Sequence, residues 1–87
     1  MNLTLTNLEN CFKAAKEEGT FYIGVAIKVG NQEVPEIIIN THENFDTKLE
    51  YYKSAYNENL TLKTNADIRI VGFSHDDSTD NIICDLF

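Results

Sequence analysis

Residues 20–29 alternate between large apolar side chains and small or polar ones, and this alternation constrains the fold more than any other feature. Successive side chains of a β-strand point to opposite faces of a sheet, so the pattern predicts a strand with one face on a core. The intervening residues, from Tyr22 to Lys28, face the other way. The large apolar positions are Phe21, Ile23, Val25, Ile27 and Val29.

The segment that follows predicts a partner strand. Gly30 favours the positive φ of a hairpin turn, and residues 34–40 carry a run of apolar β-branched side chains. Pro35 has no backbone N–H to donate to a sheet ladder, so this second strand is expected at the edge of the sheet.

The register of these two strands follows from matching their apolar faces. One extra turn residue sets Val25 opposite Ile37 and Ile23 opposite Ile39. We therefore expect a three-residue or bulged turn between the strands.

Two longer segments have helical periodicity. Residues 7–18 carry an apolar stripe, with Thr6 and Glu9 spaced as a capping box and Gly19 placed to end the helix. A second helix is expected to begin after a cap at Asn40 or Thr41 and to run to about Glu58. Its apolar stripe comprises Phe45, Leu49, Tyr52, Ala55 and Tyr56.

The C-terminal third predicts one more strand and a short helix. Residues 68–74 form the strand, with Ile68, Ile70 and Phe73 facing inward if the chain kinks at Gly72. Ser78 is a suitable N-cap for a helix over 79–86. This helix is expected to present Ile82, Ile83 and Leu86 to the core.

The order of elements is therefore α-β-β-α-β-(α), within one small domain spanning 1–87. It predicts a two-layer α+β sandwich. The three-stranded, mainly antiparallel sheet has the order 2-1-3, with the helices on one face. A chain of 87 residues has a thin core and little room for a deep pocket, which argues against an enzyme.

Charge narrows the classes of partner. Asp and Glu number 14 against 7 Lys and Arg, a formal net charge of −7. Such a surface repels nucleic acids and anionic membranes, so direct binding to either is not expected. The N-terminal residues do not resemble a signal peptide, and no apolar run is long enough to span a membrane. With Cys11 and Cys84 far apart in sequence, a cytoplasmic protein with free, mostly buried thiols is expected.

Motifs for catalysis or cofactors are not apparent, so no enzyme activity, cofactor or metal site is predicted. The segment from His75 to Asp80 spaces its oxygen ligands as a calcium loop does. It has Asn81 and Phe87 where the EF-hand needs glycine and glutamate, so a solvated loop is the favoured interpretation.

Two groups of carboxylates are the candidate partner-binding residues. If they meet on one side, they would present negative charge to a basic protein surface much as phosphates do. The same residues also fit an ordinary solvated surface, which is the commoner case. The groups are Glu43, Asp46 and Glu50 on the second helix, and Asp76, Asp77 and Asp80 near the C-terminus.

The outer face of the sheet, or an exposed edge, is a candidate dimer contact, which would make the protein a homodimer of structural or regulatory role. Partial cover of this face by the C-terminal residues Ile83, Leu86 and Phe87 is the alternative. The candidate dimer residues are Tyr22, Ile38, Arg69 and Val71.

In size, charge and phrases such as Pro35-Glu36-Ile37-Ile38-Ile39-Asn40 and Ile68-Arg69-Ile70-Val71-Gly72-Phe73, the chain resembles small acidic accessory proteins of phages and prophages. Anti-CRISPR proteins are the best-known functional group among them. The resemblance implies a stoichiometric inhibitor or adaptor in a bacterial host cell. Such a protein would block a nucleic-acid-binding host protein by contact, without catalysis.

Overall fold

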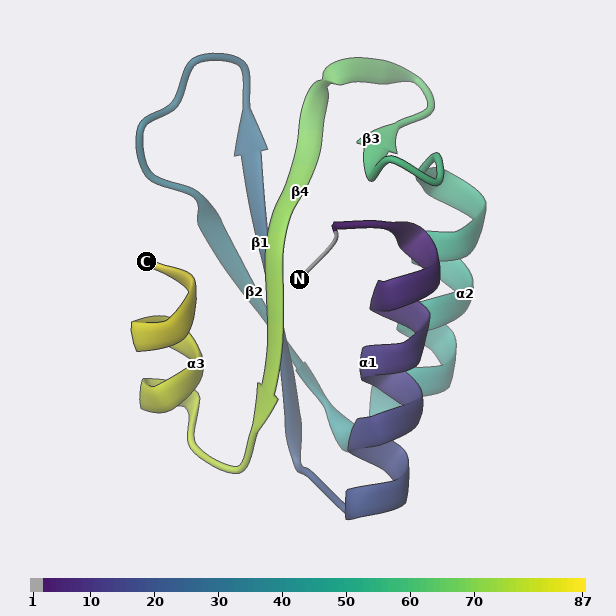
Figure 1. Ribbon diagram of the computed structural model, residues 1–87, viewed down its shortest axis with the longest axis vertical. Coiled ribbons are helices and arrows are strands. Elements are labelled where there is room, and N and C mark those ends of the chain that lie inside the picture. Colours follow the sequence, from purple (N-terminus) through teal and green to yellow (C-terminus); the bar gives the residue numbers. More distant parts are fainter. Residues whose placement is uncertain (1–2) are drawn as a thin grey trace.

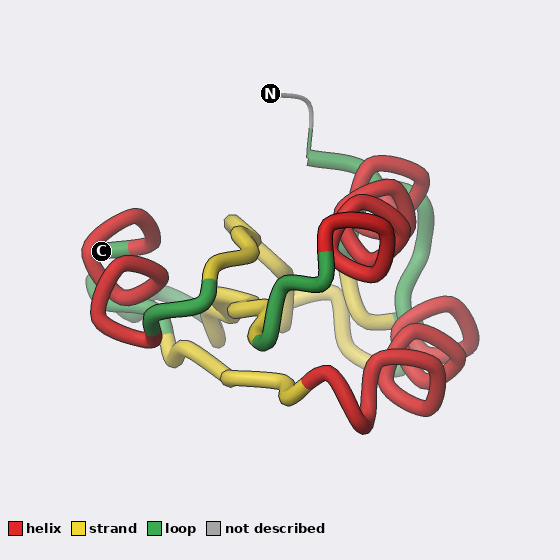
Figure 2. The backbone as a smooth tube through the Cα atoms, turned by 90° about the horizontal axis from the view of Figure 1, so that it is seen from below, coloured by secondary structure: helices red, strands yellow, loops and turns green. Residues whose placement is uncertain are grey.

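The computed structural model describes residues 3–87, which form a four-stranded antiparallel sheet between helices on both faces (Figures 1 and 2). The strand order is β2-β1-β4-β3. Two helices, α1 and α2, lie on one face, and α3 lies on the other. The elements are α1 (Leu5–Glu18), β1 (Tyr22–Val29), β2 (Glu36–Thr41), the 3-10 turn η1 (His42–Asn44), α2 (Phe45–Ala55), β3 (Thr61–Leu62), β4 (Asn65–Asp76) and α3 (Thr79–Leu86).

The α+β class and the antiparallel sheet are confirmed, whereas two details of the predicted architecture are wrong. The two-residue strand β3 pairs with β4 and adds a fourth strand to the predicted order. The helices do not share one face, because α3 packs on the opposite side from α1 and α2. The molecule therefore has three layers.

Helix α1 begins earlier than predicted because its N-cap is Thr4. The Thr4 hydroxyl accepts a hydrogen bond from the backbone N–H of Asn7 at 3.1 Å. The expected capping box is wrong: the Thr6 hydroxyl instead donates to Glu58 Oε1, at 2.6 Å. The predicted end is confirmed, since Gly19 adopts the left-handed conformation with φ +70°.

The register between β1 and β2 differs from the predicted one by a residue. Val25 lies opposite Ile38 and Ile23 lies opposite Asn40. Directly opposed residues share a face, so Ile37 and Ile39 point away from α1 and α2. The prediction assumed that a short turn sets the register, but residues 28–35 lie outside the β1–β2 ladder, and the end of β1 pairs with β4 alone.

The predicted kink in the third long strand is confirmed as a β-bulge in β4. Ala26 lies opposite Gly72 and Ile27 opposite Ile70, which leaves Val71 as the extra residue. The bulge shifts the alternation by one position. Ile70 and Phe73 therefore both reach the core formed with α1 and α2, although three positions separate them.

This main core joins α1 and α2 to one face of the sheet. Phe12 is its centre, with edge-to-face packing on Phe45 and a tilted contact with Tyr52. Phe21, which the alternation placed in the core, precedes β1 and is 52 % exposed. The buried members are Leu8, Phe12, Ala15, Ile23, Val25, Phe45, Tyr52, Tyr56, Leu60, Ile70 and Phe73.

Helix α3 has the predicted bounds and the predicted cap, since Ser78 Oγ accepts from the backbone N–H of Asn81. Its Ile82 is fully buried over Gly24, and Leu86 lies over Gly72. Ile83 was expected to face the core, but it is 39 % exposed. Glycine at positions 24 and 72 lets the helix approach the sheet closely.

Gly24→Ala should separate α3 from the sheet. An alanine Cβ at position 24 would overlap Ile82 Cγ2, whereas one at position 72 would lie 3.1 Å from Cδ2, at the far end of the Leu86 side chain, and 4.0 Å from Ala26 Cβ. We expect Gly24→Ala to lower the free energy of unfolding by about 1–3 kcal/mol. Gly72→Ala, the matched control, should change it little. Urea denaturation measures both, and equal losses would contradict the close contact at Gly24.

Candidate protein-binding surface

The clearest surface feature lies at the end of the sheet where β1 begins. Phe21 is held there through its backbone: its N–H donates to Asp77 Oδ1 at 2.9 Å, and its carbonyl accepts from the His42 N–H at 2.8 Å. The Phe21 ring lies 5.3 Å from the His42 ring and remains half exposed. A fixed backbone thus presents an aromatic side chain to solvent.

An open hollow lies beside this ring. Phe21 and His42 form one side of it, and the buried Phe45 forms part of its floor. The end of α1 contributes Lys16 and Gly19 to the same hollow. The arrangement brings the η1–α2 junction beside the end of α1 and the start of β1, which lie more than twenty residues earlier in the chain.

Three carboxylates contact residues that line this hollow. Asp46 forms an ion pair with Lys16 Nζ at 2.6 Å, and Glu43 Oε1 lies 4.0 Å from His42 Nε2. Asp77 binds the Phe21 backbone. We call Phe21, His42, Glu43, Asp46 and Asp77 the Phe21 surface. It includes members of both predicted acidic groups.

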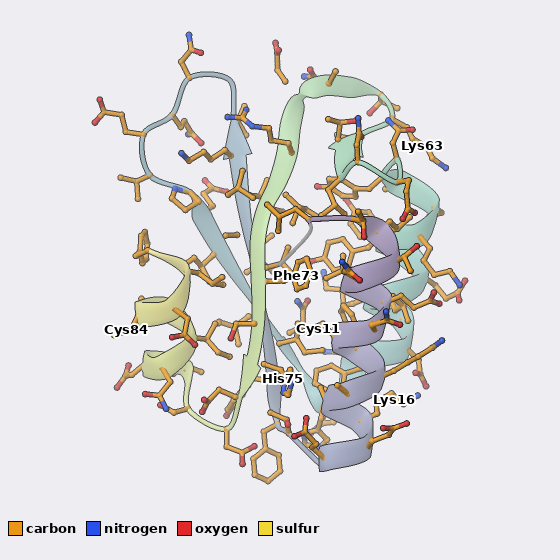
Figure 3. The ribbon with its side chains drawn as sticks, in the orientation of Figure 1. Cys11, Lys16, Lys63, Phe73, His75 and Cys84 are labelled. Atoms are coloured by element: carbon orange, nitrogen blue, oxygen red, sulfur yellow. The ribbon has the colours of Figure 1, made fainter. Side chains whose placement is uncertain are left out.

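A further histidine lies close to the Phe21 surface. His75 Nε2 is 3.5 Å from Glu18 Oε2, and His75 Nδ1 is 3.2 Å from the hydroxyl of Thr20 (Figure 3). Both ring nitrogens are therefore engaged within the fold, and the His75 side chain is 27 % exposed. These contacts link the end of α1 to β4.

The other predicted carboxylates lie elsewhere or are used internally. Glu50 is exposed further along α2, and Asp80 is exposed on α3, across the sheet. Asp76 Oδ1 accepts hydrogen bonds from the Ser78 backbone N–H at 2.8 Å and from the Asn81 side chain. These bonds, the Ser78 one foremost, hold the pKa of Asp76 below its ordinary value.

The candidate dimer residues do not share a face. Ile38 lies opposite Val25 and so faces the side of α1 and α2, contrary to expectation. Tyr22 lies two residues before Gly24, on the face that α3 partly covers. Arg69 Nη1 donates to the Gly30 carbonyl and so holds the turn after β1, while Val71 is the bulge residue.

Among residues 3–87, two buried side-chain atoms in the main core have no hydrogen-bond partner. Asn40 donates through Nδ2 to the Ile23 carbonyl, but its Oδ1 has no partner, and neither has the Tyr52 hydroxyl. Burial raises the pKa of Tyr52 to about 12, against a weaker lowering influence of the nearby Asn40 side chain. The sequence analysis placed Asn40 at a helix entrance and missed its burial.

No protein-family model, curated protein or solved structure matches this chain. Within residues 3–87, no three His, Cys, Asp or Glu side chains are grouped so that they could hold a metal ion. The same range contains no helix with the length and apolar character needed to cross a membrane.

Sequence reasoning missed Phe21 and His42 as members of this surface. Phe21 continued the apolar alternation of β1 and was assigned to the core, while His42 was treated as part of a helix entrance. The position of Phe21 directly before the strand was the available signal. It did not indicate that Asp77, more than fifty residues later, would hold the Phe21 backbone.

The two cysteines should differ in reactivity. Cys84 is exposed on α3, contrary to the expectation of a buried thiol, while burial raises the pKa of Cys11 to about 11 (Figure 3). At pH 8 only about one Cys11 thiol in a thousand is ionised, and the thiolate is the reactive form. With a colorimetric disulfide reagent, we expect one fast thiol in the native protein and a second after denaturation. Cys84→Ser should abolish the fast reaction, and its persistence would contradict this assignment.

Tyr52 should make the fold sensitive to alkali. Its pKa is 10.0 when unfolded and about 12 in the core, so the neutral phenol is favoured by folding. That stabilisation is complete below pH 10 and is lost as the pH rises towards 12. Tyr52→Phe should retain stability over this range better than the wild type and cost less than about 1 kcal/mol at pH 7, because the lost hydroxyl has no partner. Tyr51→Phe, at a half-exposed ring, is the control, and an equal benefit from it would exclude Tyr52 as the cause.

Proposed function

We propose that this protein is a small acidic protein-binding module that docks through the Phe21 surface onto a basic, nucleic-acid-binding surface of a host protein. The observation that carries the proposal is the half-exposed Phe21 ring with carboxylates around it. Protein interfaces commonly bury an aromatic anchor near their centre and surround it with a polar rim.

The backbone contacts of Phe21 support a preorganised anchor. Its N–H and its carbonyl are both bonded, to Asp77 and His42, so docking would immobilise little beyond the side chain. Less conformational entropy is then lost on binding than from a mobile loop. The hollow beside the ring offers room for an aliphatic or guanidinium side chain of the partner.

Charge supports the choice of partner. The formal net charge of −7 steers the protein towards basic surfaces, and Glu43 and Asp46 project from the same end as Phe21. Carboxylates at this end would take the place of nucleic-acid phosphates on the partner. The protein would then act as a stoichiometric inhibitor in the cytoplasm of a bacterial host, as in phage accessory proteins, with no catalytic step.

The proposal is tested by measuring how tightly variants of this protein bind one captured partner. The tagged protein is used to capture its partner from bacterial lysate, and the affinity of the purified pair is measured by calorimetry at about 50 and 300 mM salt. Phe21→Ala should weaken binding by about tenfold or more. Glu43→Lys with Asp46→Lys should weaken it strongly at low salt and less at high salt.

The matched control reverses the same charge at the far end of the sheet, with Glu33→Lys and Asp67→Lys, where both residues are exposed. Equal weakening by the two double variants would indicate a bulk charge effect and exclude docking through the Phe21 surface. Nucleic acid should compete with the protein for the partner. If both bind at once, the inhibitor mechanism is wrong.

A further inference from the structure

The sheet has two edges, and they differ sharply. One edge is β3, which is two residues long. The other is β2, six residues long, and within residues 3–87 no strand pairs with its outer side (Figure 2). In Figure 2 the strand that leads into η1 borders the molecule, with no further element beyond it.

The hydrogen-bond pattern identifies the backbone groups on this edge. The His42 N–H donates to the Phe21 carbonyl, so this opposed pair is a hydrogen-bonded one. Such pairs recur at every second residue of an antiparallel ladder, and the β1–β2 register has no shift. Residues 36, 38 and 40 therefore bond to β1. The N–H and C=O groups of Ile37, Ile39 and Thr41 point outward.

The side chains do not protect this edge. Natural sheets block an edge with lysine, proline, a bulge or a very short strand. Between Ile37 and Thr41 the chain has no charge, no proline and no bulge. Pro35 lies just before β2, and Glu36 is the sole charged residue of β2. Apart from Asn40, the residues from Ile37 to Thr41 favour strands.

We propose that β2 pairs with β2 of a second copy, antiparallel, about a two-fold axis through Ile39, to form one continuous sheet. In this register Ile39 lies opposite Ile39 of the second copy, and Ile37 lies opposite Thr41. Every outward N–H and C=O from Ile37 to Thr41 then has a partner. A two-fold axis through Ile38 would instead set Pro35 opposite Thr41. The Thr41 carbonyl would then have no donor, because proline has no backbone N–H.

Charge also favours a second copy at this edge in this register. A chain of net charge −7 repels its copy over most of its surface, but from Ile37 to Thr41 the two strands meet without charge. The sole charged residue of β2, Glu36, comes opposite His42 of the second copy rather than another carboxylate. The contact is isologous, so it closes as a dimer. The contact shares His42 with the Phe21 surface, but the argument for it does not rest on the proposed docking of a host protein.

A disulfide across the axis tests the register. In a Cys84→Ser background, Ile39→Cys would place two thiols in a hydrogen-bonded pair, with Cα atoms about 5.5 Å apart. Under a glutathione redox buffer we expect a covalent dimer on a non-reducing gel. Ile37→Cys is the matched control. In this register, position 37 of the second copy lies about four residues away along the strand, which is too far for a disulfide. Equal cross-linking of both variants would mean random collision and overturn the proposal.

A charge pair provides a test that does not require disulfide geometry. Ile39→Lys and Ile39→Glu should each be monomeric, since like charges would face each other, and a mixture of the two should form a heterodimer. Sedimentation of the wild-type protein should show twice the monomer mass at high concentration. Circular dichroism verifies that both variants fold. A wild type that stays monomeric up to about 1 mM, or variants that do not pair when mixed, would overturn the proposal.

Discussion

Strand β1 is buried on both of its faces, and the rest of the structure depends on this. Ile23 and Val25 pack beneath α1 and α2, while Gly24 and Ala26 form the surface on which α3 lies. A helix can approach this second face because the side chains there are small. β1 also pairs on both edges, with β2 and with β4. The strand thus joins all three layers.

The Phe21 surface is a consequence of how β1 begins. The strand's first neighbour on one side is η1 and on the other is the end of β4, so the Phe21 backbone bonds to both His42 and Asp77. The ring is half exposed, while Phe45 and Ala15, which line the same hollow, are buried. An apolar side chain is therefore held at the surface near carboxylates, and the proposal of a protein partner at this end rests on that arrangement.

Much of the fold was predictable, because its signals act over a few residues. Gly19 ends α1, Ser78 begins α3, and the spacing of Ile70 and Phe73 required the bulge in β4. The acidic character was equally plain. The failures include Ile38, which was assigned to the outer face, Asn40, whose burial was missed, and Thr6, whose hydroxyl bonds to Glu58 instead of capping α1. In each case a distant contact outweighed a local preference.

The sequence by itself determined the helices, the long strands, the edge position of β2 and the charge, since periodicity, caps, proline geometry and composition are local properties. Tertiary structure decided the register of β2, the face of the sheet on which α3 packs, and which residues contact Phe21. The physical reason is that these depend on which surfaces fit together. Gly24 accepts Ile82, the long 28–35 connection leaves the β2 register to side-chain packing, and Asp77 reaches Phe21 only once β4 lies beside β1.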